Sequence, residues 1–163
     1  MGGTIDSYYD GIKETSVPNQ KTIIPQYIGN LKLQRERVLF TTVCLKDSRQ
    51  ITSEDHKKVA KVIAGSKATR IIITHGTYTM PDTARYIEAH LNSKKNNKKI
   101  ILTGSFIPLN GFTMSDGGFN IGFALGVMDY IKEGVYVAMN GRLFRASEVI
   151  KFASEGVFSS ILK

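Results

Sequence analysis

The chain alternates between short apolar runs and longer amphipathic stretches. The apolar runs that read as buried strands are Arg37 to Leu45, Arg70 to Thr74, Lys99 to Thr103 and Val135 to Met139. Stretches in which apolar residues recur at helical spacing separate these runs. Strands that alternate with helices favour a parallel sheet covered by helices on both faces. We therefore predict a three-layer, doubly wound α/β fold with a mainly parallel sheet.

The first amphipathic stretch opens with a start signal that is typical of helices. Thr52 is followed by Asp55 three positions later, which is a variant of the capping box. Val59, Val62 and Ile63 then recur at spacings that place them on one helical face. The pattern predicts a helix that begins after Thr52 and packs this face inward.

Two further helices are expected downstream. One spans Asp82 to Leu91, with Pro81 at its start, where the missing N–H has no intrahelical partner to lose. The other is capped by Asp116 and runs through Tyr130, although glycines lower helix propensity by up to ~1 kcal/mol each relative to alanine. We expect close packing against the sheet to explain its glycines, which are Gly117, Gly118, Gly122 and Gly126.

The composition fits one globular domain. The chain has 163 residues, of which 42% are hydrophobic, and one cysteine, Cys44, so an intrachain disulfide and a cysteine-rich zinc site are excluded. Cys44 lies in the first apolar run, where we expect a small buried side chain in a strand. No run approaches the ~20 apolar residues of a membrane span, and no signal-peptide pattern opens the chain. We expect no membrane partner and a cytoplasmic location.

The net charge of +8 raises the question of a nucleic-acid partner. Much of this charge lies in two hydrophilic stretches, Lys57 to Lys61 and Lys94 to Lys99. The second has the composition of a solvated loop, and no aromatic residue interleaves with it. We therefore expect no nucleic-acid partner. A nucleotide-binding domain ranks last among the functions considered, because the G-x-G-x-x-G and Walker patterns are both absent.

Two glycine turns carry the candidate chemistry. The first is Gly2-Gly3-Thr4-Ile5, and the second is His75-Gly76-Thr77-Tyr78-Thr79-Met80, which directly follows the apolar run ending at Thr74. In α/β sheets, ligands bind at the carboxyl ends of the strands. Glycine lets the backbone come close to a ligand, and a threonine hydroxyl can act as a nucleophile when a base or a cation activates it.

The two turns resemble hallmarks of the L-asparaginase/glutaminase family, a T-G-G-T-I turn and an H-G-T-D-T-M turn. Further matches follow in order and span nearly the whole chain: Asp47 to Thr52, Thr103 to Pro108, Ser115 to Gly117, and Asn140 to Lys151. The resemblance implies a single domain over residues 1–163, Rossmann-like or flavodoxin-like in fold. It corresponds to the N-terminal domain of two-domain enzymes, without their C-terminal domain, and to short one-domain members of the cytoplasmic type.

The resemblance also implies an L-asparaginase-type amidohydrolase that releases ammonia from L-asparagine or a related small amide. Thr4 would attack the side-chain carbonyl, and Thr77 would lie across the substrate beside the base Lys151. The irregular residues 6–37 would form a lid whose tyrosine, Tyr8 or Tyr9, lies near the nucleophile. The implied substrate-binding residues are Gly3, Asp47, Ser48, Arg49, Gly76 and Tyr78. No cofactor and no metal are implied, and a homo-oligomer is expected.

Three departures from the family pattern matter. Tyr78 stands where the family has aspartate, and a phenol supplies no negative charge for an ammonium group at neutral pH. Met1 directly precedes Gly2, so the first strand of the family's sheet is missing. Arg49 adds a cation near the presumed carboxylate site. An alternative hypothesis follows, in which the chain is a catalytically impaired relative that binds a small amino acid or acts as an interaction module.

Overall fold

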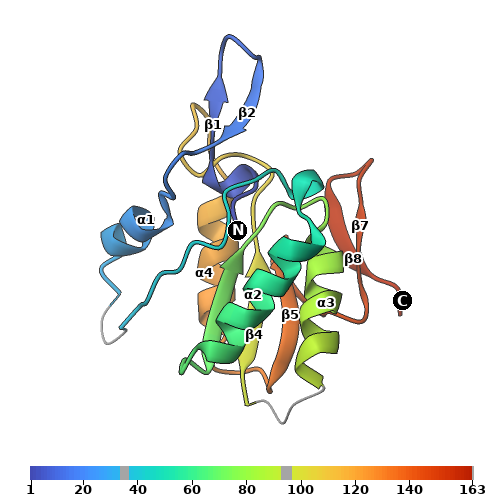
Figure 1. Ribbon diagram of the computed structural model, residues 1–163. Helices are drawn as coiled ribbons and strands as arrows, with labels where there is room; N and C mark the ends of the chain where they lie inside the picture. Colours follow the sequence, from blue (N-terminus) through green and yellow to red (C-terminus); the bar gives the residue numbers. More distant parts are fainter. Residues whose placement is uncertain (34–36, 93–96, 163) are drawn as a thin grey trace.

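The computed structural model describes residues 1–33, 37–92 and 97–162, and its centre is a four-stranded sheet (Figure 1). The strand order is β3-β4-β5-β6. Strands β3, β4 and β5 run parallel, whereas β6 is antiparallel to β5. The strands are β3 (Arg70–Thr74), β4 (Lys99–Thr103), β5 (Gly134–Met139) and β6 (Arg142–Arg145). The predicted strands over residues 70–74, 99–103 and 135–139 are thus confirmed.

Helices cover both faces of this sheet (Figure 1). One face carries α2 (Ser53–Gly65) and α3 (Met80–Asn92), and the opposite face carries α4 (Gly117–Val127). The predicted three-layer α/β architecture is therefore confirmed. Among the described residues, no helix is long and apolar enough to cross a lipid bilayer.

Alternating side chains of β4 divide the core into two layers. Ile100 and Leu102 are fully buried on the side that also holds Ile87 of α3. Ile101, between them, is fully buried with Ala124 of α4. Successive side chains of a strand point to opposite faces, so a central strand that is buried on both faces reads as a continuous apolar run. This explains why the sequence pattern located the strand correctly.

The start of α2 is the capping box that the sequence predicts. The Thr52 hydroxyl accepts from the Asp55 N–H at 3.3 Å, and Asp55 Oδ2 accepts from the Thr52 N–H at 3.0 Å. Val59 and Ile63 are buried as expected, but Val62 is 39% exposed, so its predicted place on the inward face is wrong. The inward stripe continues through Ala60 instead, since a face set by positions 59 and 63 leaves position 62 at its margin.

The glycines of α4 have two different environments. Cβ atoms added at Gly117 and Gly118 would meet Ser115 Oγ at 3.1 Å and Tyr27 Oη at 2.7 Å, respectively. Added Cβ atoms at Gly122 and Gly126 would meet nothing within 4 Å, so the prediction that they pack closely on the sheet is wrong. Gly122 and Gly126 lie on the outward side of α4, and the inner side of this helix is apolar.

Asp116 occupies the N-cap position of α4, but its side chain makes no capping hydrogen bond. Its carboxylate instead accepts from the N–H groups of Phe106 and Ile107 at 3.0 Å. The helix ends at Val127, and Tyr130, which the sequence places on it, lies beyond its end and is 90% exposed. Asp116 therefore fastens the loop after β4 to the start of α4.

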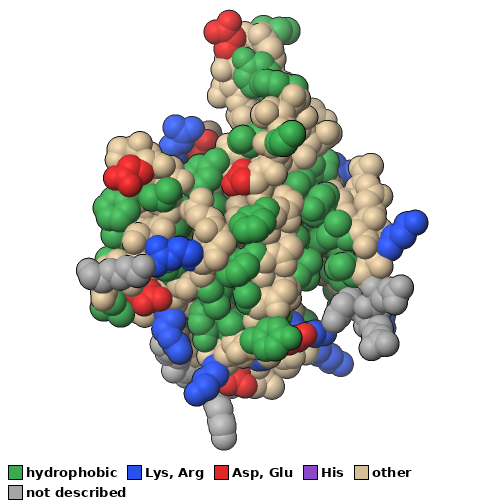
Figure 2. Space-filling model, turned by 180° about the vertical axis from the view of Figure 1, so that it is seen from behind, with side chains coloured by type: hydrophobic (Ala, Val, Ile, Leu, Met, Phe, Trp, Pro, Cys, Tyr) green, Lys and Arg blue, Asp and Glu red, His purple; other side chains and the backbone are tan. Residues whose placement is uncertain are grey.

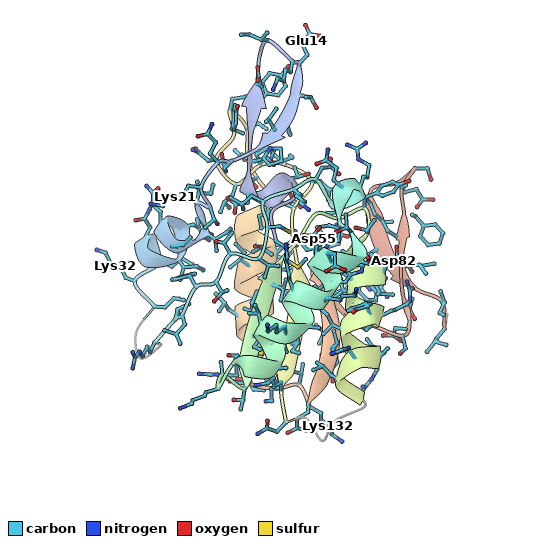
Figure 3. All side chains as sticks on the ribbon, viewed as in Figure 1. Glu14, Lys21, Lys32, Asp55, Asp82 and Lys132 are labelled. Atoms are coloured by element: carbon cyan, nitrogen blue, oxygen red, sulfur yellow. The ribbon has the colours of Figure 1, made fainter. Side chains whose placement is uncertain are left out.

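Two antiparallel hairpins flank this central body (Figure 1). The first projects away from the sheet and has Glu14 near its tip, with a left-handed φ of 49° (Figure 3). The second lies beside α3. Short elements complete the chain. In order, these elements are η1 (Thr4–Asp6), β1 (Ser7–Asp10), β2 (Thr15–Pro18), α1 (Ile24–Asn30), η2 (Ser48–Gln50), β7 (Val149–Phe152) and β8 (Val157–Ser160).

The predicted strand from Arg37 to Leu45 is wrong. This segment forms no strand, and Val38, Leu39 and Phe40 are 41%, 75% and 47% exposed. The segment meets the N-terminus only at its end, through a parallel bridge between Gly2 and Lys46. Among the described residues, no strand pairs with residues 37–45, so this segment has no partner that would make it a strand.

The first three residues mark where such a neighbour would lie. The Met1 ammonium donates to Thr74 O at 2.7 Å, and the Gly3 N–H donates to Lys46 O at 2.8 Å. Cys44, expected in a strand, is half-buried beside this junction, and its Sγ donates to Met1 O at 3.7 Å. Part of the predicted basic loop, residues 93–96, lies outside the described residues.

Candidate active site

A pocket opens where the N-terminal turn meets the turn that follows β3. It lies at the carboxyl end of a parallel strand, which is where α/β sheets bind ligands. All of its lining residues were identified from the sequence: Gly3, Thr4, Asp47, Ser48, Arg49, Gly76, Thr77 and Tyr78. The structure therefore brings together three segments that are far apart along the chain.

Close backbone contact between two glycines holds the two threonine turns together. A Cβ atom added at Gly3 would lie 2.2 Å from the backbone N and Cα of Gly76. Gly3 also has a φ of 82°, in the region that favours glycine. A Cβ atom added at Gly76 would lie 2.6 Å from Ser48 Oγ. The backbone of Gly76 thus leaves no room for a side chain at Gly3, and Ser48 leaves none at Gly76. Thr4 and Thr77 follow directly on the two glycines.

Lys151 reaches the pocket from β7 and contacts Thr77. Its Nζ donates to Thr77 Oγ1 at 2.8 Å, and the rings of Phe106 and Tyr78 lie 5.1 and 5.7 Å from the same nitrogen. Burial lowers the pKa of Lys151 below the ordinary lysine value of 10.5. The Arg85 guanidinium of α3 donates to Val149 O and so fixes β7 against the body of the domain. Thr77 and Lys151 form a hydroxyl–amine pair.

Phe106 also lies close to Lys151, and the sequence did not indicate this contact. It follows the carboxyl end of β4 by three residues, and its ring also packs 6.3 Å from the ring of Phe158. An aromatic residue in a loop carries no signal of contact with a distant lysine. Its ring and that of Tyr78 nevertheless limit the water around the amine, which is the physical origin of the lowered pKa.

The loop that contains η2 presents an ion pair and a hydroxyl to the pocket. Both oxygens of Asp47 accept from the Arg49 guanidinium, Oδ1 from Nε at 3.0 Å and Oδ2 from Nη2 at 2.7 Å. The side-chain hydrogen bonds that Arg49 donates to Asp47 lower the pKa of Asp47 and raise the pKa of Arg49. Ser48 is buried, and its carbonyl accepts from the Thr79 hydroxyl at 2.8 Å, which ties this loop to the turn after β3.

Tyr8 and Tyr9 lie outside the pocket. Both belong to β1 of the projecting hairpin, where they are 42% and 44% exposed. The ring of Tyr9 meets Phe112 edge-on at 5.1 Å. The structure therefore does not bring either tyrosine among the lining residues around Thr4.

His75 anchors the second turn from behind. Its Nδ1 lies 2.8 Å from Gly76 O and so carries the proton of a donor, while Thr83 Oγ1 lies 3.0 Å from its Nε2. Burial lowers the pKa of His75 to about 4, so the ring is neutral and Nε2 accepts from the Thr83 hydroxyl. His56 Nε2 lies 3.0 Å from the same hydroxyl, which accepts from it. This directed chain of hydrogen bonds gives His75 a structural role, which is to hold the turn after β3 against α3.

The described part of the chain offers no gathering of three or more His, Cys, Asp or Glu side chains that would hold a metal ion. The titratable groups that are close to the two hydroxyls are instead an amine, a guanidinium and the carboxylate paired with it. The arrangement therefore supplies two hydroxyls, an amine of lowered pKa and a guanidinium at the rim.

Comparison with known sequences identifies relatives of this chain. The family model of the N-terminal part of asparaginase matches residues 1–161. The probable periplasmic L-asparaginase of Haemophilus influenzae is 34% identical over 115 residues, which make up 68% of this chain and 32% of that protein. The glutaminase-asparaginase of Acinetobacter glutaminasificans is 30% identical over 98 residues, or 58% and 28% of the two chains. The chain spans about a third of the length of these relatives.

Solved structures extend the comparison to the fold. L-asparaginase I from Vibrio cholerae superposes with a TM-score of 0.81 at 32% identity, over 98% of this chain and 48% of that chain. The probable cytoplasmic L-asparaginase of Campylobacter jejuni gives 0.74 at 26% identity, over 98% and 49%. The thermostable L-asparaginase of Thermococcus kodakarensis gives 0.80 at 24% identity, over the same shares, and shows the fold alone. With residues 1–161 matched by the family's N-terminal part, the chain belongs to the asparaginase family.

Proposed function

We propose that the chain is an amidohydrolase that hydrolyses the side-chain amide of an asparagine-like substrate to a carboxylate and ammonia. The observation that supports this proposal most strongly is the 2.8 Å contact between Lys151 Nζ and Thr77 Oγ1, at a pocket that Thr4 also lines. Hydroxyl nucleophiles need a neighbouring base or cation to react at neutral pH. The pocket lining supplies the two hydroxyls, and Lys151 of β7 contacts one of them.

In this proposal Thr4 is the nucleophile. Its Oγ1 attacks the amide carbonyl carbon, and the carbon–nitrogen bond breaks as ammonia leaves with an added proton. Water then attacks the resulting ester and restores the Thr4 hydroxyl. Neutral Lys151 accepts a proton through Thr77 and returns it to the leaving group. Backbone N–H groups of the two glycine turns stabilise the oxyanion that forms in each step.

The choice of an amide as substrate rests on the relatives, which are named as asparaginases or as a glutaminase-asparaginase. Ser48 and the cation of Arg49 are proposed to hold the substrate's carboxylate. Gly3, Gly76, Asp47 and Tyr78 shape the remaining walls. A single domain, a cytoplasmic location and a homo-oligomer remain part of the proposal, and a probable cytoplasmic relative supports the second of these.

The alternative proposal, a binding or interaction protein without catalysis, is favoured by Tyr78. The side chain of Tyr78 is 59% exposed at the rim of the pocket and offers no carboxylate to an amino-acid substrate. A relative that kept the pocket but lost turnover would still bind a small ligand.

Ammonia release by the purified chain tests the two proposals. The wild type is incubated with L-asparagine, L-glutamine and succinamate, alongside Thr4→Ala and Thr77→Ala. Thr113→Ala is the matched control, because Thr113 is an exposed threonine outside the pocket. We expect release by the wild type and Thr113→Ala, and a loss of at least 100-fold in both pocket variants. No release from any amide by a folded wild type would overturn the proposal and favour the binding protein.

A further inference from the structure

The charges around the pocket indicate what kind of amide fits it. Asp47 is the single carboxylate among the described lining residues, and both of its oxygens accept from Arg49. Asp6, two residues after Thr4, is buried and accepts from Asn19 Nδ2 and the Ile23 N–H. Neither carboxylate is therefore available to a ligand without first losing its present partners.

In the Asp47–Arg49 pair, the side chain of Arg49 is the more exposed member, at 68% against 36% for Asp47. Arg49 lines the pocket, with a side chain that is 68% exposed, and Lys151 contacts the Thr77 hydroxyl on another side. An ammonium group placed here would give up water without gaining a negative partner, and the guanidinium of Arg49 would repel it. A carboxylate would meet the opposite conditions, because Asp47 engages two of the five N–H donors of the Arg49 guanidinium and a ligand can bind the others.

Tyr78 gives the pocket an aromatic surface. The Tyr78 ring lies 5.7 Å from Lys151 Nζ, and the phenol can pack against uncharged atoms of a ligand. An acyl group or a plain methylene suits this surface better than an ammonium group with its tightly held water. The lining therefore selects for negative charge at one end of a ligand and against positive charge near the middle.

We propose that the preferred substrates are small primary amides that carry a carboxylate but no free α-ammonium group. Succinamate and N-acetyl-L-asparagine represent this class. The inference rests on the proposed amidohydrolase function and narrows its substrate. Tyr78 determines the specificity by the charge that it does not supply. The reaction is unchanged: the amide carbon–nitrogen bond is cleaved by water to give a second carboxylate and ammonium.

The test compares substrates that differ only at the α-nitrogen. Values of kcat/KM for ammonia release are measured with succinamate, N-acetyl-L-asparagine and L-asparagine, using wild type, Tyr78→Asp and Tyr78→Asn. Aspartate and asparagine have the same shape, so Tyr78→Asn is the matched control for charge. We expect the wild type to prefer the two substrates without an ammonium group by at least tenfold. Tyr78→Asp should reverse this preference, and Tyr78→Asn should keep it.

Calorimetric binding to Thr4→Ala separates this inference from the proposed function. Tighter binding of succinamate than of L-asparagine, together with no turnover by the wild type, would support the substrate class while the proposed hydrolysis fails. Binding of neither compound would overturn the inference. A wild-type preference for L-asparagine, or a preference that Tyr78→Asp leaves unchanged, would also overturn it, even if ammonia is released.

Discussion

At the scale of single residues, the amine of Lys151 is the group whose titration should govern the rate. Burial lowers the pKa of Lys151 below 10.5, so its neutral, proton-accepting form is populated at lower pH than that of an exposed lysine. We predict that kcat/KM rises as pH increases through this lowered pKa and then levels off. Ammonia release measured between about pH 6 and pH 10 reports the profile.

Lys151→Arg is the informative variant for this prediction, because arginine keeps the positive charge but does not deprotonate in this range. The variant should lose the rising limb together with at least 100-fold in rate. Lys132→Arg, the same exchange at an exposed position (Figure 3), serves as the control and should retain the profile. A rate in the wild type that does not change with pH would exclude Lys151 as the base.

The sequence could predict the lining residues of the pocket because each follows from short, local patterns. Glycines beside threonines mark the two turns, and the turn after β3 lies at a strand end by simple topology. The contacts of Phe106 with Lys151, and the chain from His56 through Thr83 to His75, could not be predicted. These contacts join side chains from different elements, and the spacing of the residues along the sequence follows no regular pattern.

At the scale of elements, the start of α2 carries a pH-dependent contribution to stability. Burial alone would raise the pKa of Asp55, but hydrogen bonds from Lys46 and Thr52 outweigh it and lower the pKa from 3.8 to about 2. A carboxyl whose pKa is lowered by folding adds stability above its unfolded pKa. This stability is lost as pH falls through the folded pKa.

We predict that Asp55→Asn lowers the free energy of unfolding at pH 7 by about 1–2 kcal/mol, allowing for solvent around the lysine. The difference from wild type should shrink between about pH 4 and pH 2. Urea unfolding at several pH values measures it. Glu54→Gln, at the exposed neighbouring carboxylate, should change stability by less than about 0.5 kcal/mol. An equal effect of Asp55→Asn at every pH would rule out the ion pair as its cause.

The elements that the sequence predicted correctly are those with their own periodicity and caps. The strand predicted at Arg37 to Leu45 failed for a reason that lies outside the segment. An apolar run becomes a strand only when another strand pairs with it, and the described residues supply no such partner next to this run. The predictions for Val62, Gly122 and Gly126 were wrong for a similar reason. Helical spacing shows which residues share a face, but not how much of that face is covered by other elements.

At the scale of the whole molecule, we propose the outward face of α4 as the surface for self-association in the proposed homo-oligomer. Hydrophobic side chains gather on the rear of the molecule, where α4 lies (Figure 2). Phe119 of α4 is 63% exposed, and no charged residue lies within α4. A molecule of net charge +8 meets a second copy with least repulsion through an uncharged face.

We predict that Gly122→Lys shifts the protein to an 18.1 kDa monomer in size-exclusion chromatography with light scattering, whereas the wild type associates. An added side chain at Gly122 meets nothing within the protomer, so a change reflects contacts between protomers. Gly11→Lys makes the same change in charge at another open position and should not alter the mass. If Gly122→Lys stays associated, the interface lies elsewhere, and a monomeric wild type would refute the oligomer.

The close contact of Gly3 with Gly76 means that two positions far apart in the sequence must evolve together. A Cβ atom at Gly3 would collide with the backbone of Gly76, and one at Gly76 would collide with Ser48, so a side chain at either position requires a neighbouring segment to move. Mutant libraries of this protein should keep both glycines and vary Tyr78 and Arg49. A related sequence that lacks either glycine is therefore expected to lack this pocket.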